Sequence, residues 1–221
     1  MKTSFDLSGA QFSCIREFAI ASATVIAKGA VVKLVGGLVV LAAAGETGAI
    51  LGITEEDHVG GTVTDIFNTR SNGKKIFVKC SSTQAFNGQA QKIVAGAVVG
   101  ATSVAAVALN VFADDDLNGG YIKLVAKATA STNPAALGTI TPITDFTKSG
   151  GVITAAVTAT TGDTYEVYPP IGFAGGNFNA TATDVIITAT AALPIAVLGY
   201  DFDLSRVIYI PKLHAFATSR T

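Results

Sequence analysis

The chain has 221 residues, of which 49% are hydrophobic and only 14% are charged. Intrinsic disorder is excluded, because a disordered chain needs low hydrophobicity and high net charge. The formal net charge is -1, from 15 basic and 16 acidic residues. Nucleic acids and anionic lipids are bound by basic surfaces, so we expect neither as a partner. The length allows one large domain or two small ones, each with its own core.

The N-terminal segment, residues 1–18, carries aromatic side chains without a strict period. Phe5, Phe12 and Phe18 lie among Ser, Asp, Gln and Arg, and no apolar run typical of a secretion signal follows the start. A solvated tail does not normally hold so many large apolar groups, since removing them from water gains roughly 25 cal/mol per Å². We therefore predict an arm that lies against a neighbouring subunit, with these three phenylalanines as the contact candidates.

The clearest local signal is a hairpin over residues 31–41. Two β-branched runs, 31–35 and 38–41, are separated by Gly36 and Gly37. Glycine supplies the positive φ that tight hairpin turns require. Further strands are expected at residues 49–54, 62–67 and 76–80, the last two joined by a turn at Asn72-Gly73.

Residues 93–113 contain no charged side chain and are about as long as the ~20 residues of a membrane-spanning helix. Glycine, threonine, serine and asparagine interrupt this segment, and valine is its main large residue. We therefore predict two buried strands on either side of a turn at residues 100–103, and no membrane span.

The second half of the chain also consists of short predicted strands separated by turn residues. Strands are expected at residues 121–125, within 151–161, and at 165–168, 184–188, 195–198 and 206–210. Short strands at roughly ten-residue spacing are typical of sandwiches and barrels. The sequence predicts an all-β protein in which the arm is followed by a first domain over residues 19–110 and a second, β-sandwich-like domain over residues 111–221.

One stretch matches the opening of a calcium-binding loop. Asp114, Asp116 and Asn118 alternate and are followed by a glycine, so that their oxygens point inward around an ion. The full pattern demands a glutamate six residues after the glycine, and that position is Val125. An acidic β-turn is the favoured interpretation, and calcium stays the one candidate metal. We expect no bound cofactor.

The sequence offers no pattern of nucleophile, base and acid, so we predict that the chain is not an enzyme. His58 follows three acidic residues, which is typical of a solvated loop, and His214 is interpreted as a structural residue of a terminal strand. Cys14 and Cys80 either form one disulfide with each other or are both unpaired thiols. The second alternative is favoured, since a lone cysteine behaves as a small buried hydrophobe.

Residues 27–54 contain the Gly-Gly hairpin and a following Gly-Ala-Ile-Leu-Gly-Ile-Thr run, and this stretch resembles the capsid decoration (cement) proteins of tailed bacteriophages. Residues 161–169 and 199–216 also look like segments of phage virion proteins. The resemblance implies a small β-barrel or β-tulip domain in the first half of the chain. It further implies a structural virion protein, made in the host cytoplasm, that lies on the outer capsid surface and binds the major capsid protein.

The composition favours the same class. A charge-poor, apolar chain is suited to assembly in many copies, so we expect a homo-oligomer, with a trimer as one form. The alternative is a β-rich binding module of a phage fibre or a surface adhesin. Carbohydrate sites of such modules usually use stacking aromatic residues, and this chain has no tryptophan.

Overall fold

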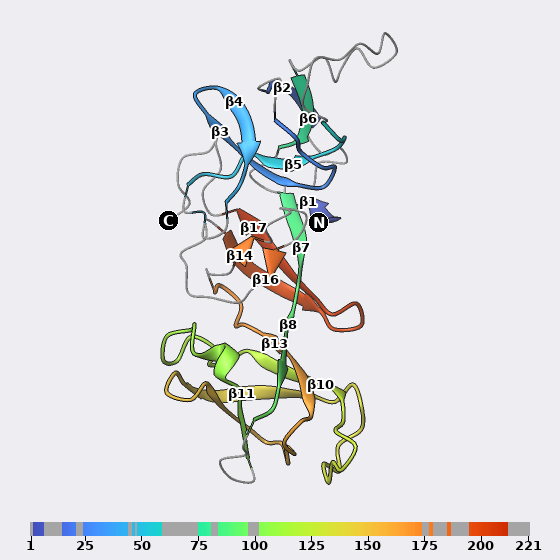
Figure 1. The fold of residues 1–221 in the computed structure, drawn as a ribbon, viewed down its shortest axis with the longest axis vertical. Helices are drawn as coiled ribbons and strands as arrows, with labels where there is room; N and C mark the ends of the chain where they lie inside the picture. Colours follow the sequence, from blue (N-terminus) through green and yellow to red (C-terminus); the bar gives the residue numbers. More distant parts are fainter. Residues whose placement is uncertain are drawn as a thin grey trace.

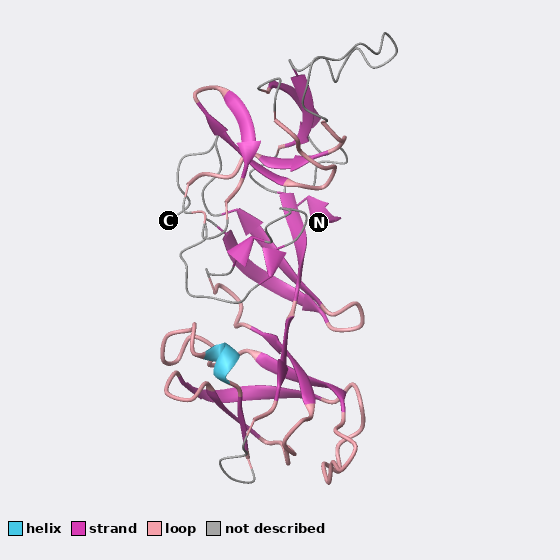
Figure 2. Cartoon of the chain, in the orientation of Figure 1, coloured by secondary structure: helices cyan, strands magenta, loops and turns pink. Residues whose placement is uncertain are grey.

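A computed structural model of the chain describes residues 2–6, 15–20, 24–43, 46, 48–58, 75–80, 84–96, 102–173, 177–178, 185–186 and 195–211. In these residues the protein is all-β, as predicted. The strands form three sheets, and the only helical element of the described part is a short 3₁₀ helix, η1 (Val107–Leu109). Figures 1 and 2 show the three sheets following one another along the long axis of the molecule.

The first sheet curls back on itself. Its strand order is β2 (Ile15–Ala19), β6 (Lys75–Lys79), β5 (Gly52–Thr54), β3 (Val31–Val35) and β4 (Leu38–Leu41). A parallel bridge between Ile20 and Val39 links the chain after β2 to β4, at the opposite edge. The enclosed core includes Val32, Leu51 and Ile76. The predicted Gly-Gly hairpin is confirmed: Val35 pairs with Leu38, and both glycines have positive φ.

The second sheet has β7 (Gln84–Gln89) at its centre. Its order is β14 (Asn177–Phe178), β15 (Val185–Ile186), β7, β17 (Arg206–Pro211) and β16 (Ile195–Asp201), and β1 (Lys2–Asp6) also pairs with β7. The pairing of β7 is antiparallel with β17 and parallel with β15. Strands from the two ends of the chain therefore meet on one central strand.

The described part of the predicted arm belongs to these two sheets. Residues 2–6 pair with β7 and residues 15–19 pair with β6. Phe18 is half-buried and packs against the core of the first sheet, whereas Phe12 lies outside the described residues. The expectation that this arm stays outside the domain core is wrong for residues 2–6 and 15–19, because ladder hydrogen bonds of β7 and β6 hold their backbone. Contact of Phe5 and Phe12 with a neighbouring subunit stays a prediction.

The third sheet is nearly a closed barrel. Its order is β8 (Gln91–Val94), β13 (Thr164–Tyr168), β10 (Tyr121–Ala126), β11 (Ile140–Thr147), β12 (Val152–Ala155) and β9 (Ser103–Ala105). The two edges meet where the Gly96 N–H donates to the Ala105 carbonyl at 2.7 Å. Phe112 and Phe146 pack edge to face inside it, with ring centroids 6.2 Å apart.

The third sheet is built from residues on both sides of position 110, where the sequence suggested a domain boundary. Strands β8 and β9 precede that position and β10–β13 follow it. The uncharged segment 93–113 holds the end of β8, then β9 and η1. Within the described ranges, no helix has the length and apolar content needed to cross a membrane. The strand expected at residues 62–67 and the turn at Asn72-Gly73 lie outside those ranges.

Candidate functional site

The residues considered for calcium form a hydrogen-bonded turn between η1 and β10. Asp114 Oδ1 accepts the Lys148 N–H at 2.6 Å, and Asp116 Oδ2 accepts the Ala113 N–H at 2.8 Å. Asn118 lies in the same turn. Across the described residues, no three His, Cys, Asp or Glu side chains gather closely enough to hold a metal ion. The carboxylates of Asp114 and Asp116 cap backbone N–H groups, which is the usual work of Asp in turns.

His58 is buried, so the solvated loop expected for it is wrong. Its backbone pairs with that of Ile26 through N–H···O distances of 2.7 and 2.9 Å, and this bridge draws the side chain inward. The His58 Nδ1 lies 2.5 Å from the Thr24 carbonyl oxygen. Cys80 is buried in the core of the first sheet. Cys14 and His214 lie outside the described residues.

The most developed polar site lies where the third sheet meets the second, and none of its residues was among the site residues predicted from the sequence. Glu166, in the middle of β13, is only 1% exposed. Lys92 on β8 and Lys123 on β10 are its direct cross-strand partners, one on each side. The lysine nitrogens lie 3.9 and 3.8 Å from the Glu166 carboxylate oxygens. Directly opposed side chains of unlike charge on one sheet face attract one another, and this row forms an ion triad.

Tyr168 adds a hydrogen bond to the ion triad. Its hydroxyl donates to Glu166 Oε2 at 2.9 Å, and both side chains are buried. Burial, together with the hydrogen bond to Glu166 and its charge, raises the pKa of Tyr168 well above its usual value of 10. The hydroxyl therefore stays protonated and remains a donor to the carboxylate.

An aromatic cluster of Tyr121, Tyr168, Tyr200 and Phe202 joins the third sheet to the β16–β17 hairpin. The Tyr168 and Phe202 ring centroids are 4.8 Å apart, and those of Tyr121 and Tyr200 are 5.6 Å apart, both pairs edge to face. The Tyr200 hydroxyl donates to the Pro169 carbonyl at 2.6 Å. Edge-to-face pairs contribute about 0.5–1.5 kcal/mol each beyond their area burial, so the cluster stabilises the contact between the third sheet and this hairpin.

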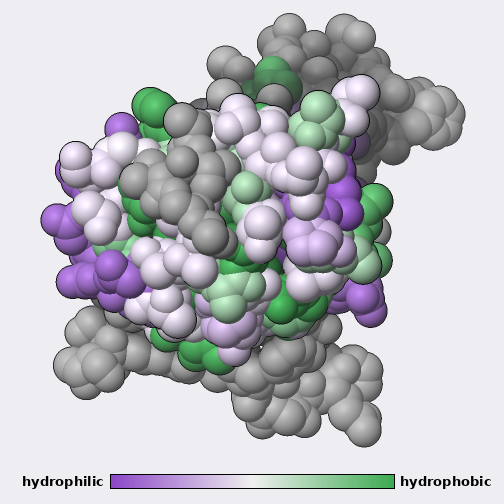
Figure 3. All heavy atoms as spheres, turned by 90° about the horizontal axis from the view of Figure 1, so that it is seen from below, coloured by the Kyte–Doolittle hydropathy of each residue, from purple (hydrophilic) through white to green (hydrophobic). Residues whose placement is uncertain are grey.

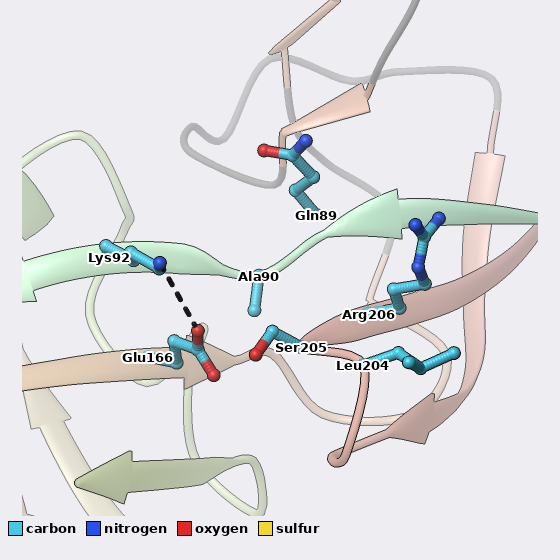
Figure 4. Close-up of a pocket in the computed structure, with 7 residues that line it drawn as sticks. All are labelled: Gln89, Ala90, Lys92, Glu166, Leu204, Ser205 and Arg206. Atoms are coloured by element: carbon cyan, nitrogen blue, oxygen red, sulfur yellow. Dashed lines mark ion pairs between the residues drawn. The ribbon is translucent and has the colours of Figure 1, made fainter. Parts of the chain in front are cut away.

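A cavity of about 200 Å³ opens beside the ion triad. Figure 4 shows its lining: Gln89, Ala90, Lys92, Glu166, Leu204, Ser205 and Arg206. Ser205 has a φ of 57°, and its carbonyl accepts the Ala90 N–H at 3.1 Å. This left-handed residue turns the hairpin back toward the chain between β7 and β8. The cavity presents charges and hydrogen-bonding groups, an arrangement suited to binding a charged group.

A signal for this site is present in β13 itself. In Thr164–Tyr168, Tyr165 and Val167 face the core of the third sheet, so Glu166 and Tyr168 point the other way. All four are buried, which means that β13 is covered on both faces. A glutamate inside such a strand needs partners. The sequence predicted β13 as a strand. It did not predict that its second face is covered, because the β16–β17 hairpin that covers this face begins more than 25 residues later.

We expect Tyr168→Phe to lower the free energy of unfolding by about 1–3 kcal/mol, because the buried Glu166 carboxylate loses a donor while the ring packing is kept. Tyr121→Phe is the matched control in the same aromatic cluster, and we expect it to change stability by less than about 0.5 kcal/mol. Urea denaturation followed by tyrosine fluorescence compares the two variants. Equal effects of both substitutions would show that the hydrogen bond to Glu166 does not stabilise the junction.

Comparison of the chain with models of protein families, with curated proteins and with solved structures found no match of any of the three kinds.

Proposed function

We propose that the chain is a structural virion protein that decorates a bacteriophage capsid by binding the outer face of the major capsid protein lattice, without enzymatic activity. The resemblance of residues 27–54 to decoration proteins supports this, and that stretch forms β3, β4 and β5 of the first sheet. The observation that carries the proposal is the arrangement of exposed apolar side chains at two places far apart on an elongated molecule.

The first place is the tip of the β3–β4 hairpin. Val35 and Leu38 flank the Gly-Gly turn and are exposed, Val35 by 54%. The second place is η1 and the turn after it, where Val107 is 78% exposed and Val111 is also exposed. Figure 2 shows the hairpin and η1 (cyan) well separated along the long axis. A molecule with apolar contacts at both places is suited to bridging neighbouring subunits of a shell.

The surface at the end of the molecule formed by the third sheet is compatible with contact to another protein. Figure 3 views the molecule from that end: hydrophobic residues (green) lie between weakly polar ones (white), and strongly hydrophilic ones (purple) gather at the sides. Apolar contact is little affected by salt, unlike contact between exposed charges. Repetition over a symmetric lattice then raises avidity without any new contact.

The test is co-sedimentation with undecorated shells assembled from the major capsid protein of the bacteriophage to which the proposal assigns this chain. We expect the chain to sediment with the shells in both low and high salt. The double variant Val35→Ser, Leu38→Ser loses about 2 kcal/mol of apolar burial, so its binding should weaken about 30-fold. Val25→Ser is the control, because Val25 is 64% exposed but belongs to the segment that bridges to His58 and not to the hairpin.

Shell binding that is unaffected by the double variant would remove the hairpin from the interface. A folded chain that fails to sediment with intact shells in either salt condition would contradict capsid decoration. The β-rich fibre or adhesin module would then be the better description.

A further inference from the structure

Two cations at the cavity beside the ion triad are poorly neutralised. Lys92 is 68% exposed, and its nitrogen lies 3.9 Å from Glu166, the longest ion-pair distance in the described chain. Arg206 forms no ion pair with any residue in the described ranges. Both side chains line the cavity, one on each side of Ala90 in Figure 4.

The one carboxylate that lines the cavity is already compensated on its other side. Glu166 Oε2 accepts the Tyr168 hydroxyl and lies 3.8 Å from the Lys123 nitrogen. Lys123, which also donates to the Phe202 carbonyl, is largely buried and does not line the cavity. The charge of Glu166 is therefore shared with a lysine behind it, which leaves positive charge at the open side.

Two acidic residues lie near this space, Asp201 at the end of β16 and Asp203 in the turn that follows, and both are outside the lining. Asp201 is the direct cross-strand partner of Arg206, but the two side chains form no ion pair, and Asp201 Oδ1 accepts the Leu204 N–H at 3.0 Å. A volume of about 200 Å³ corresponds to about seven water molecules at roughly 30 Å³ each. That is enough for a carboxylate with its methylene stem. Leu204 and Ser205 supply an apolar contact and a hydroxyl beside the two cations.

We propose that this cavity binds a carboxylate, presented by an acidic side chain of the shell protein. This proposal rests on the proposed function. The guanidinium of Arg206 offers paired N–H donors to a carboxylate, and Lys92 adds a second charge-assisted hydrogen bond. An ion pair in a partly enclosed cavity fixes the register of two partners, while the apolar contacts of the hairpin and of η1 supply the adhesion.

The first arm of the test uses the chain alone with glutarate as a probe of acidic side chains. Backbone amide shifts of Gln89, Ala90 and Arg206 are followed by NMR up to about 50 mM, where a site of millimolar affinity saturates. We expect saturable shifts at these amides, and about tenfold weaker binding for Arg206→Gln and for Lys92→Gln. Lys28→Gln is the control, because Lys28 is exposed and does not line the cavity. Absence of saturable shifts, equal effects of the control, or tighter binding of inorganic phosphate would each overturn the carboxylate site.

The second arm repeats the co-sedimentation in low salt with the same variants. We expect Arg206→Gln to weaken shell binding several-fold and Lys28→Gln to leave it unchanged. Glutarate binding without an effect of Arg206→Gln on shell binding would overturn the shell protein as the source of the carboxylate. Glutarate binding by a wild-type chain that does not bind shells would contradict the proposed function and leave the carboxylate site standing.

Discussion

Gly52→Ala is expected to lower the stability of the first sheet by about 4 kcal/mol or more, an effect reached only by severe steric conflict. A Cβ atom at this position would lie 1.9 Å from the Lys79 carbonyl oxygen. Neither backbone can move away freely, because Ile53, next to Gly52, pairs with Lys79, and Gly52 itself pairs with Val32. The substitution therefore forces β5 away from β6.

Amide hydrogen exchange is the suitable measurement, because it reports each sheet separately. The Thr54 amide, which donates to Ala30 in the first sheet, should lose about three orders of magnitude of protection, while the Leu124 amide of the third sheet keeps its own. Gly199→Ala is the control, since no atom lies within 4 Å of its added Cβ. Unchanged protection of Thr54 in Gly52→Ala would mean that β5 and β6 are not packed this closely.

Asp163→Asn is expected to destabilise the third sheet by about 2–4 kcal/mol at neutral pH. The carboxylate is fully buried and accepts hydrogen bonds from the Ala128 N–H at 3.0 Å, the Thr160 N–H at 3.2 Å and Asn133 Nδ2 at 3.0 Å. An asparagine keeps one acceptor oxygen and turns an NH₂ group toward donors. Asp145→Asn, on the exposed side of β11, is the control and should change stability by less than about 0.5 kcal/mol.

The same carboxyl makes stability depend on pH. Burial raises the pKa of Asp163, but the hydrogen bonds that it accepts outweigh burial and hold the pKa below the usual 3.8. A carboxyl whose pKa is lower in the folded state stabilises the fold above the unfolded-state pKa and loses that contribution as pH falls through the folded-state pKa. Urea denaturation of the third sheet should therefore show wild type and Asp163→Asn converging below about pH 4. A difference that stays constant down to about pH 2 would contradict this role of the charge.

Local chemistry determined much of the all-β fold. The hairpin about Gly36 and Gly37 and the strands at 121–126, 164–168 and 206–211 lie where alternation and turn residues predicted them. These features depend on neighbours only a few residues away, since a Gly-Gly turn sets its own φ values and β-branched runs favour extended backbone.

Tertiary structure alone decided which strands meet and what their outer faces contact. The backbone of residues 2–6 is held by β7, about 80 residues later, and His58 is buried because its backbone bridges to Ile26. Glu166 had no visible partner in the sequence, because Lys92 and Lys123 become its neighbours only through strand pairing. Period-two alternation indicates which residues share a face of a strand. It does not indicate which strand pairs with that strand or which hairpin covers its face, because those contacts join residues that are distant along the chain.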